Sequence, residues 1–257
     1  MPLKKSLGQN FLIDNLVIWD LLDAIDVRSN DVLLEVGAGS GAVTTELAGR
    51  AAKVYAVEFD EDLIPELTSN LEQFSNVDIV PADILRFLED YDHVKSLGIT
   101  KIVGSIPYQI TSPLIHLALK YNYPVIFVVQ KEMAERLTAK PPKANYLSTF
   151  VSLWGQAEIV RTIDRNSFNP VPGVDSAILK IVPHPVVSSV DPVAFSKFLH
   201  KGFSNPRKML NKVFNKDLLT SLDIDPMRRA ETLTLSEWLK LFDIEIGTRA
   251  EHAQPLQ

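Results

Sequence analysis

Residues 31 to 41 read Asp-Val-Leu-Leu-Glu-Val-Gly-Ala-Gly-Ser-Gly, a short apolar run that ends in three alternating glycines. Such a run is typical of a buried strand, and the glycines allow a tight turn into a following helix. In a doubly wound sheet, this turn is where a nucleotide-like ligand approaches the main chain. The spacing is G-x-G-x-G, which is neither the G-x-G-x-x-G dinucleotide fingerprint nor a P-loop. On its own, the turn could also be only a tight strand-to-helix connection.

Apolar runs and helix-like segments alternate on both sides of this turn. Near-continuous apolar strands separated by helices indicate a parallel sheet covered on both faces, and thus an α/β fold. Two late runs have no long helix between them and predict an antiparallel addition at one edge of the sheet. The predicted strands are 31–36, 53–58, 77–80, 101–103, 125–129, 150–154 and 177–182, and the clearest helices are 42–51 and 61–74.

The chain changes character after residue 182. Residues 183–192 contain three prolines and two serines, which predict a linker. Beyond it, short helices are expected at 192–203, 206–215, 217–222 and 234–242, with a frayed tail at 250–257. We therefore predict a large first domain, 1–185, and a small helical domain, 190–250, which fits a chain of 257 residues.

Composition excludes several classes of protein. The chain has no cysteine, which excludes disulfides, thiolate zinc sites, iron–sulfur clusters and cysteine nucleophiles. Its five histidines lack metal-ligand spacing, so no metal is expected. No apolar run approaches a membrane span, and the first residues lack a signal core, so we expect a cytoplasmic, monomeric protein without a membrane partner. Trp19, Trp154 and Trp238 fall among apolar residues and are predicted to lie in the core.

Two acidic residues follow the next two strands. Glu58 ends the second strand, where a carboxylate would bind ribose hydroxyls in a doubly wound fold. Asp83 follows the third strand, where it could accept a hydrogen bond from an adenine amino group. Either residue alone could be a surface or capping residue. Together with the glycine turn around Gly37 and Gly39, they favour an adenosine-containing ligand at the carboxyl ends of the strands.

The fourth strand ends in Ser105-Ile-Pro107-Tyr108 at the same edge. The plain interpretation is a strand ended by proline, with a half-buried tyrosine. The chemical interpretation concerns an adenine N6 amino group, whose lone pair is delocalised into the ring. Acceptors on its two N–H groups, from Ser105 and a backbone carbonyl near Pro107, would localise that lone pair toward an electrophile. Tyr108 would then stack on the extruded base.

Nearly the whole chain resembles the KsgA-type small-subunit rRNA adenine dimethyltransferases, a branch of the Rossmann-like class I S-adenosylmethionine-dependent methyltransferases. The C-terminal segments favour this branch over the related large-subunit methylases. The resemblance is carried by the segment 7–12 (Leu-Gly-Gln-Asn-Phe-Leu), Glu35 to Gly41, Glu58, Asp83, Ile106-Pro107-Tyr108, Phe168-x-Pro170-x-Pro172-x-Val174-Asp175-Ser176, Phe203-x3-Arg207-Lys208-x-Leu210 and Arg229-Ala230-Glu231-x-Leu233-x-Leu235.

The resemblance implies a seven-stranded, mostly parallel sheet and roles for individual residues. Gly37 and Gly39 would pack against S-adenosyl-L-methionine, Glu58 would bind its ribose and Asp83 its adenine. Asn10 and Leu12 would close over the cofactor, and Tyr108 and Phe168 would hold the target base. The implied activity is N6,N6-dimethylation of two adjacent adenines in the 3′-terminal hairpin of small-subunit rRNA, within an immature ribosomal subunit.

One residue departs from the family pattern. Ser105 stands where the family has asparagine, and its hydroxyl is shorter and lacks the amide's arrangement of donors and acceptors. A displacement of about 1 Å can cost roughly a hundredfold in rate. Three hypotheses therefore stay open: a working dimethyltransferase, a slow or non-catalytic RNA-binding assembly factor, and a large-subunit rRNA methylase.

Charge along the chain is uneven. The totals of 26 basic and 32 acidic side chains give a net charge of −6, which alone argues against nucleic acid. Residues 192–216, however, hold six Lys or Arg and no Asp or Glu. Either this is a soluble basic surface or it contacts RNA phosphates. The candidate RNA-binding residues are Lys197, Lys201, Arg207, Lys208 and Lys212.

Overall fold

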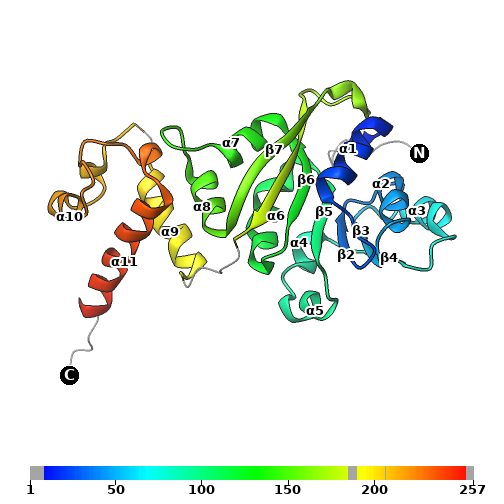
Figure 1. Cartoon of the computed structure of the whole chain (residues 1–257), viewed down its shortest axis with the longest axis horizontal. Helices are drawn as coiled ribbons and strands as arrows, with labels where there is room; N and C mark the ends of the chain where they lie inside the picture. Colours follow the sequence, from blue (N-terminus) through cyan, green and yellow to red (C-terminus); the bar gives the residue numbers. More distant parts are fainter. Residues whose placement is uncertain (1–8, 185–189, 206, 253–257) are drawn as a thin grey trace. The chain divides into compact units, whose positions relative to one another are not determined.

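The computed structural model describes residues 9–184, 190–205 and 207–252, with side chains of the last helix described up to Glu245. The chain divides into two compact units (Figure 1). The first comprises Met1–Glu135 and Gln156–His184, and the second comprises Arg136–Gly155 and Pro185–Gln257. The segment 136–155, which the sequence places in the first domain, thus belongs to the second unit. Residues 7 and 8 of the N-terminal motif, most of the linker and the end of the tail lie outside the described residues.

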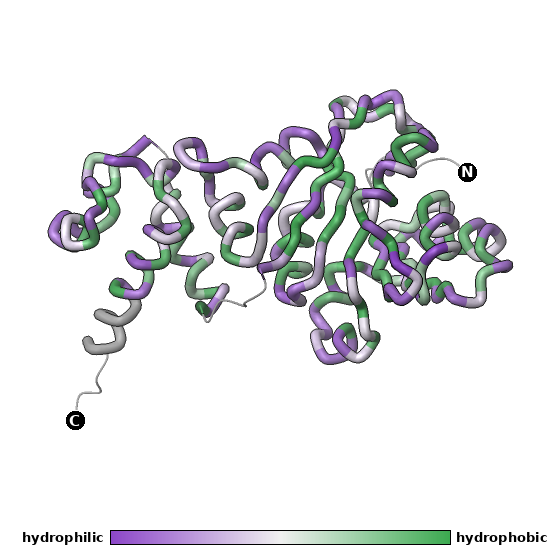
Figure 2. The backbone as a smooth tube through the Cα atoms, in the orientation of Figure 1, coloured by the Kyte–Doolittle hydropathy of each residue, from purple (hydrophilic) through white to green (hydrophobic). Residues whose placement is uncertain are grey.

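The first unit contains a seven-stranded sheet in the order β4-β3-β2-β5-β6-β9-β7. The five strands from β4 to β6 are parallel, and β9 runs antiparallel to β6. This confirms the predicted Rossmann-like α/β fold, and Figure 2 shows hydrophobic residues along the inner strands. The strands are β2 (Val32–Val36), β3 (Lys53–Glu58), β4 (Val77–Pro81), β5 (Lys101–Ser105), β6 (Val125–Gln130), β7 (Gly155–Ile163) and β9 (Ser176–Pro183).

The strand predicted at 150–154 is wrong, because these residues end a helix, α8 (Tyr146–Trp154). Asn145 caps that helix by accepting from the Ser148 backbone N–H, and the Ser148 hydroxyl oxygen accepts from the Asn145 N–H. This reciprocal capping box starts a helix whose apolar residues would otherwise suit a strand. The strand at the edge of the sheet, β7, begins only at Gly155.

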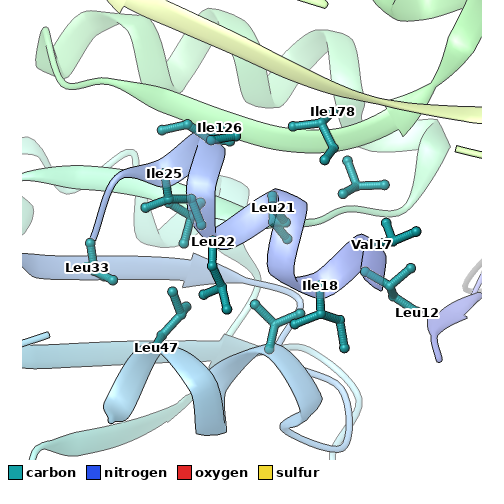
Figure 3. Close-up of a cluster of buried hydrophobic side chains, with 14 of the residues drawn as sticks. Leu12, Val17, Ile18, Leu21, Leu22, Ile25, Leu33, Leu47, Ile126 and Ile178 are labelled. Atoms are coloured by element: carbon teal, nitrogen blue, oxygen red, sulfur yellow. The ribbon is translucent and has the colours of Figure 1, made fainter. Parts of the chain in front are cut away.

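Helix α1 supplies much of the core beside the sheet. Its buried residues follow helical spacing, and Leu21, Leu22 and Ile25 pack among side chains from the strands and from α2, including Leu47 (Figure 3). Each such side chain contributes about 1.5–3 kcal/mol when fully buried. Trp19 lies off this stripe and is 53% exposed, so its predicted place in the core is wrong. The helices of this unit are α1 (Asn15–Ile25), α2 (Ala42–Ala48), α3 (Ile64–Leu71), α4 (Ile84–Phe87), α5 (Tyr91–Ser96) and α6 (Thr111–Ala118), and α7 (Lys131–Thr138) spans the division between the two units.

A separate two-stranded ribbon joins distant parts of the first unit. Strand β1 (Phe11–Leu12) pairs antiparallel with β8 (Phe168–Asn169), and Leu12 lies opposite Phe168. The ribbon continues as the Ile13 N–H donates to the Ser167 carbonyl and the Ser167 hydroxyl donates to Asp14. The N-terminal motif and Phe168 are therefore neighbours, although more than 150 residues separate them.

The second unit is helical and has its own aromatic core. Trp238 is fully buried and packs with Phe198, Phe203 and Phe214, which confirms its predicted core position. Trp154 is half-buried. Within the described ranges, no helix combines the length and apolarity needed to cross a bilayer. The helices are α8, α9 (Pro192–Phe203), α10 (Lys216–Ser221) and α11 (Leu235–His252).

The helix predicted at 206–215 is also wrong. Met209 forms an antiparallel bridge with Arg229, and a single 3-10 turn follows at Leu210–Lys212. The Leu210 N–H donates to the Arg228 carbonyl and the Asn211 N–H to the Pro226 carbonyl. These long-range backbone bonds replace the local ones that a helix needs. Helix α11, in contrast, extends beyond the predicted helix end at residue 242 and into the start of the predicted frayed tail.

Candidate active site

One cavity of about 240 Å³ opens at the carboxyl ends of the parallel strands in the first unit. All the residues predicted for catalysis and cofactor binding line it, so the fold brings together segments from six parts of the chain. These residues are Asn10, Leu12, Gly37, Gly39, Glu58, Asp83, Ser105, Pro107, Tyr108 and Phe168.

The glycine turn forms one wall of the cavity. Gly39 has a φ of +59°, in the left-handed region that favours glycine, and a Cβ there would lie 3.0 Å from the Phe11 ring. The Gly37 N–H donates to the Val57 carbonyl at 2.9 Å, which ties the turn to the end of β3. The turn is therefore shaped by its neighbours on both sides, and β1 packs directly against it.

Glu58 is held by two backbone groups. Its Oε2 accepts from the Gly39 N–H and its Oε1 accepts from the Asp60 N–H, both at 2.8 Å. A carboxylate oxygen can accept more than one hydrogen bond, so both oxygens retain capacity for a ligand hydroxyl. Gln9 donates to Asp60 at 2.6 Å, which links the N-terminal motif to this acidic turn.

Asp83 caps a short helix on the next wall of the cavity. Its Oδ1 accepts from the Leu85 N–H at 2.9 Å as the N-cap of α4. Its Oδ2 makes no hydrogen bond to any residue of the described ranges. Asp83 thus has the capping role that the sequence analysis left open, and its Oδ2 atom stays available to a ligand donor.

The far end of the cavity combines a hydroxyl with two aromatic rings. Ser105 is half-buried and lies opposite Val128 at the end of β5. Tyr108 is half-buried, its hydroxyl is hydrogen-bonded to the Ser176 hydroxyl at 2.8 Å, and burial raises the pKa of its phenol. Phe168 is almost fully buried. A flat group entering here would meet aromatic surface and polar acceptors together.

Glu35 lines the cavity, although the sequence analysis gave it no role. It lies in the central strand β2 and is 1% exposed, and its Oε2 has no hydrogen-bond partner among the described residues. Burial raises the pKa of its carboxyl group to about 7, and the nearby Glu58 charge acts in the same direction. Its position two residues before Gly37, inside the apolar strand, was the available sequence signal.

Phe59 is a second cavity residue without a predicted role. It follows Glu58 directly, lines the cavity and is 59% exposed. An exposed phenylalanine after a strand-ending acid is unusual for a packing residue and offers a ring face to a ligand. Its position directly after Glu58 is the sequence signal that could have identified Phe59 as a cavity residue.

The predicted RNA-binding residues all belong to the second unit. Lys197, Arg207, Lys208 and Lys212 are exposed. Lys201 differs, because its ammonium group forms an ion pair with Glu245 and lies 4.8 Å from the centre of the Phe214 ring. Its charge is thus partly neutralised within the unit. Across the described ranges, no group of three His, Asp or Glu side chains is arranged to hold a metal ion.

A family sequence model and individual related sequences agree on what this chain is similar to. Residues 2–246 match the sequence model of the family described as ribosomal RNA adenine dimethylase. Ribosomal RNA small subunit methyltransferase A of Bacillus mycoides is 37% identical, over 93% of this chain and 89% of that protein. The same-named protein of Bacillus thuringiensis is 36% identical over the same shares.

Solved structures of two methyltransferases resemble more than nine-tenths of the chain. A dimethyladenosine transferase from Plasmodium falciparum has a TM-score of 0.82 and 25% identity, over 93% of this chain and 98% of that one. The 23S rRNA methyltransferase ErmE has a TM-score of 0.71 and 25% identity, over 91% and 98% of the two chains.

Proposed function

The chain belongs to the ribosomal RNA adenine dimethylase family and is a methyltransferase, and from this premise we propose its substrate, cofactor and site. The proposed reaction is N6,N6-dimethylation of two adjacent adenines in the 3′-terminal hairpin of small-subunit rRNA. The observation that carries the proposal is the cavity at the ends of the parallel strands, where two carboxylates, a hydroxyl and two aromatic rings line the same space.

The cavity fits S-adenosyl-L-methionine, which supplies an electrophilic methyl group when bound. Glu58 would accept from the ribose hydroxyls and the Oδ2 atom of Asp83 from the adenine amino group. Phe59 would present its ring to the adenine face, and Leu12 would cover the cofactor from the β1 side. The fit rests on acceptors already positioned by backbone N–H groups, so little ordering is needed on binding.

The target adenine would enter between Tyr108 and Phe168. The Ser105 hydroxyl oxygen and a backbone carbonyl near Ile106 would accept from its N6 hydrogens and localise the lone pair. That lone pair would form the new N–C bond with the methyl group that the bound cofactor supplies, the electrons of the S–C bond would remain on sulfur, and one N6 proton would be released to water. The chain's contribution is positioning and electrostatics.

The second unit would bind the RNA. Its exposed cations would contact phosphates, while the base itself is recognised in the cavity. We propose an immature small subunit as the physiological substrate, a cytoplasmic location and action as a monomer. Because the exposed cations are few, RNA affinity should depend only modestly on salt concentration.

The decisive experiment measures methyl transfer to immature small subunits and, in parallel, to free large-subunit rRNA. We expect dimethyladenine in the small-subunit RNA alone, and Ser105→Ala to lower the rate at least about tenfold because an acceptor is lost. Ser96→Ala is the control, since Ser96 is exposed on α5 and bonds only within that helix. Small-subunit binding without turnover would indicate an assembly factor, and methylation of large-subunit RNA would reassign the substrate.

A further inference from the structure

The hydroxyl of Tyr108 has a specific buried partner. It is hydrogen-bonded to the Ser176 hydroxyl at 2.8 Å, and Ser176 is 0% exposed. Ser176 is not among the residues that line the cavity, so it does not face the ligand space. Stacking on a base uses the face of a tyrosine ring and does not require its hydroxyl. The hydrogen bond between Tyr108 and Ser176 is therefore not part of the contact with the base itself.

Ser176 lies in a hydrogen-bonded strand of the sheet. It is the first residue of β9 and lies opposite Gln130 in the β6–β9 pairing. The preceding residue, Asp175, accepts from the Lys131 N–H through its carbonyl and from the Arg165 N–H through its side chain. The serine hydroxyl thus has its position set by the sheet and by two further hydrogen bonds of the neighbouring Asp175.

Tyr108, in contrast, lies on a connecting segment. It begins a single 3-10 turn between β5 and α6, and no residue of this turn is buried. Rotation about the side-chain bonds of Tyr108 would swing the ring face away from the position of a base. A bond at the far end of the ring restrains that rotation more effectively than one near the backbone, because the hydroxyl moves furthest.

We propose that Ser176 is a positioning residue that holds the Tyr108 ring in the orientation needed to stack on the target adenine. The inference rests on the proposed function and extends it to a residue outside the cavity. It predicts that Ser176 affects turnover through Tyr108 and leaves cofactor binding unchanged. Loss of one hydrogen bond of this kind corresponds to a fall of about five- to tenfold in kcat.

A double-mutant cycle tests the coupling. Ser176→Ala and Tyr108→Phe remove the same hydrogen bond from its two ends, and the second change keeps the stacking ring. We expect each to lower kcat by about five- to tenfold, and the double variant to be within about twofold of either one. Cofactor affinity, measured by calorimetry, should stay within about twofold of wild type. The proposal is overturned if the kcat losses of the two single variants multiply in the double variant, or if Tyr108→Phe turns over at the wild-type rate.

A turnover-independent measurement separates this inference from the proposed function. RNA carrying 2-aminopurine at the target position reports stacking through quenched fluorescence. Both single variants should raise its emission in the complex to the same extent, and Ser96→Ala should not change it. Absence of methylation by the wild type would reject the function, whereas unchanged emission in both variants would reject the role of Ser176. If Ser176→Ala fails to fold, Tyr108→Phe alone decides between these outcomes.

Discussion

Replacing Glu35 by glutamine should remove a large pH dependence of stability. Burial raises the pKa of this carboxyl from its ordinary value of 4.5 to about 7 in the folded protein. The folded state therefore binds the proton more tightly than the unfolded state. This contribution to stability is fully present below pH 4.5 and is lost as the pH rises through 7. The difference between the two pKa values corresponds to about 3 kcal/mol.

Chemical unfolding of wild type and Glu35→Gln between pH 4 and 8 measures this quantity. The wild-type free energy of unfolding, relative to that of the variant, should fall by about 3 kcal/mol across the range, with most of the fall between pH 4.5 and 7. Subtracting one protein from the other cancels the other titrating groups. Glu61→Gln, at an exposed glutamate, is the control and should show no such change. Parallel curves for wild type and Glu35→Gln would refute the assignment of a buried, neutralised carboxyl.

Gly202→Ala should destabilise the second unit by about 1–2 kcal/mol, because a severe clash of about 2–3 kcal/mol exceeds the helix-propensity gain of about 1. The added Cβ would lie 2.3 Å from the fully buried Trp238 ring. Urea unfolding monitored by tryptophan fluorescence measures the change in the free energy of unfolding. Gly49→Ala, whose Cβ has only ordinary contacts, is the control, and equal stability of the two variants would contradict the packing. Replacing Arg207 and Lys208 together by alanine should weaken RNA binding and reduce the salt slope by about 2, since each would contact one phosphate in the proposed complex. If filter binding shows the same salt slope for the variant and the wild type, Arg207 and Lys208 do not contact the RNA.

The sheet was predictable because its signal is local. Apolar runs such as 125–129 are buried on both faces and need no knowledge of their neighbours to be read as strands. The segment 150–154 shows where this reasoning fails. Its apolar residues fit either a strand or a helix, and the choice was made by the capping box at Asn145 upstream.

The site was predictable to the extent that its residues follow strands. Glu58 and Ser105 end parallel strands and Asp83 follows one closely, and parallel strands present their carboxyl ends at one edge. Glu35 was missed because its importance comes from burial without a hydrogen-bond partner for Oε2, which a sequence does not display. The different environment of Lys201 was missed for a similar reason, because its partner Glu245 is distant in sequence.

By itself, the sequence determined the α/β class, the glycine turn and the order of acidic residues along the sheet edge. These follow from periodicity, backbone freedom at glycine and the geometry of parallel strands, all of which act over a few residues. Only the tertiary structure decided which side chains meet across long separations. It placed Leu12 opposite Phe168, Tyr108 against Ser176 and Met209 beside Arg229. Such contacts depend on packing and long-range hydrogen bonds, whose partners no local pattern specifies.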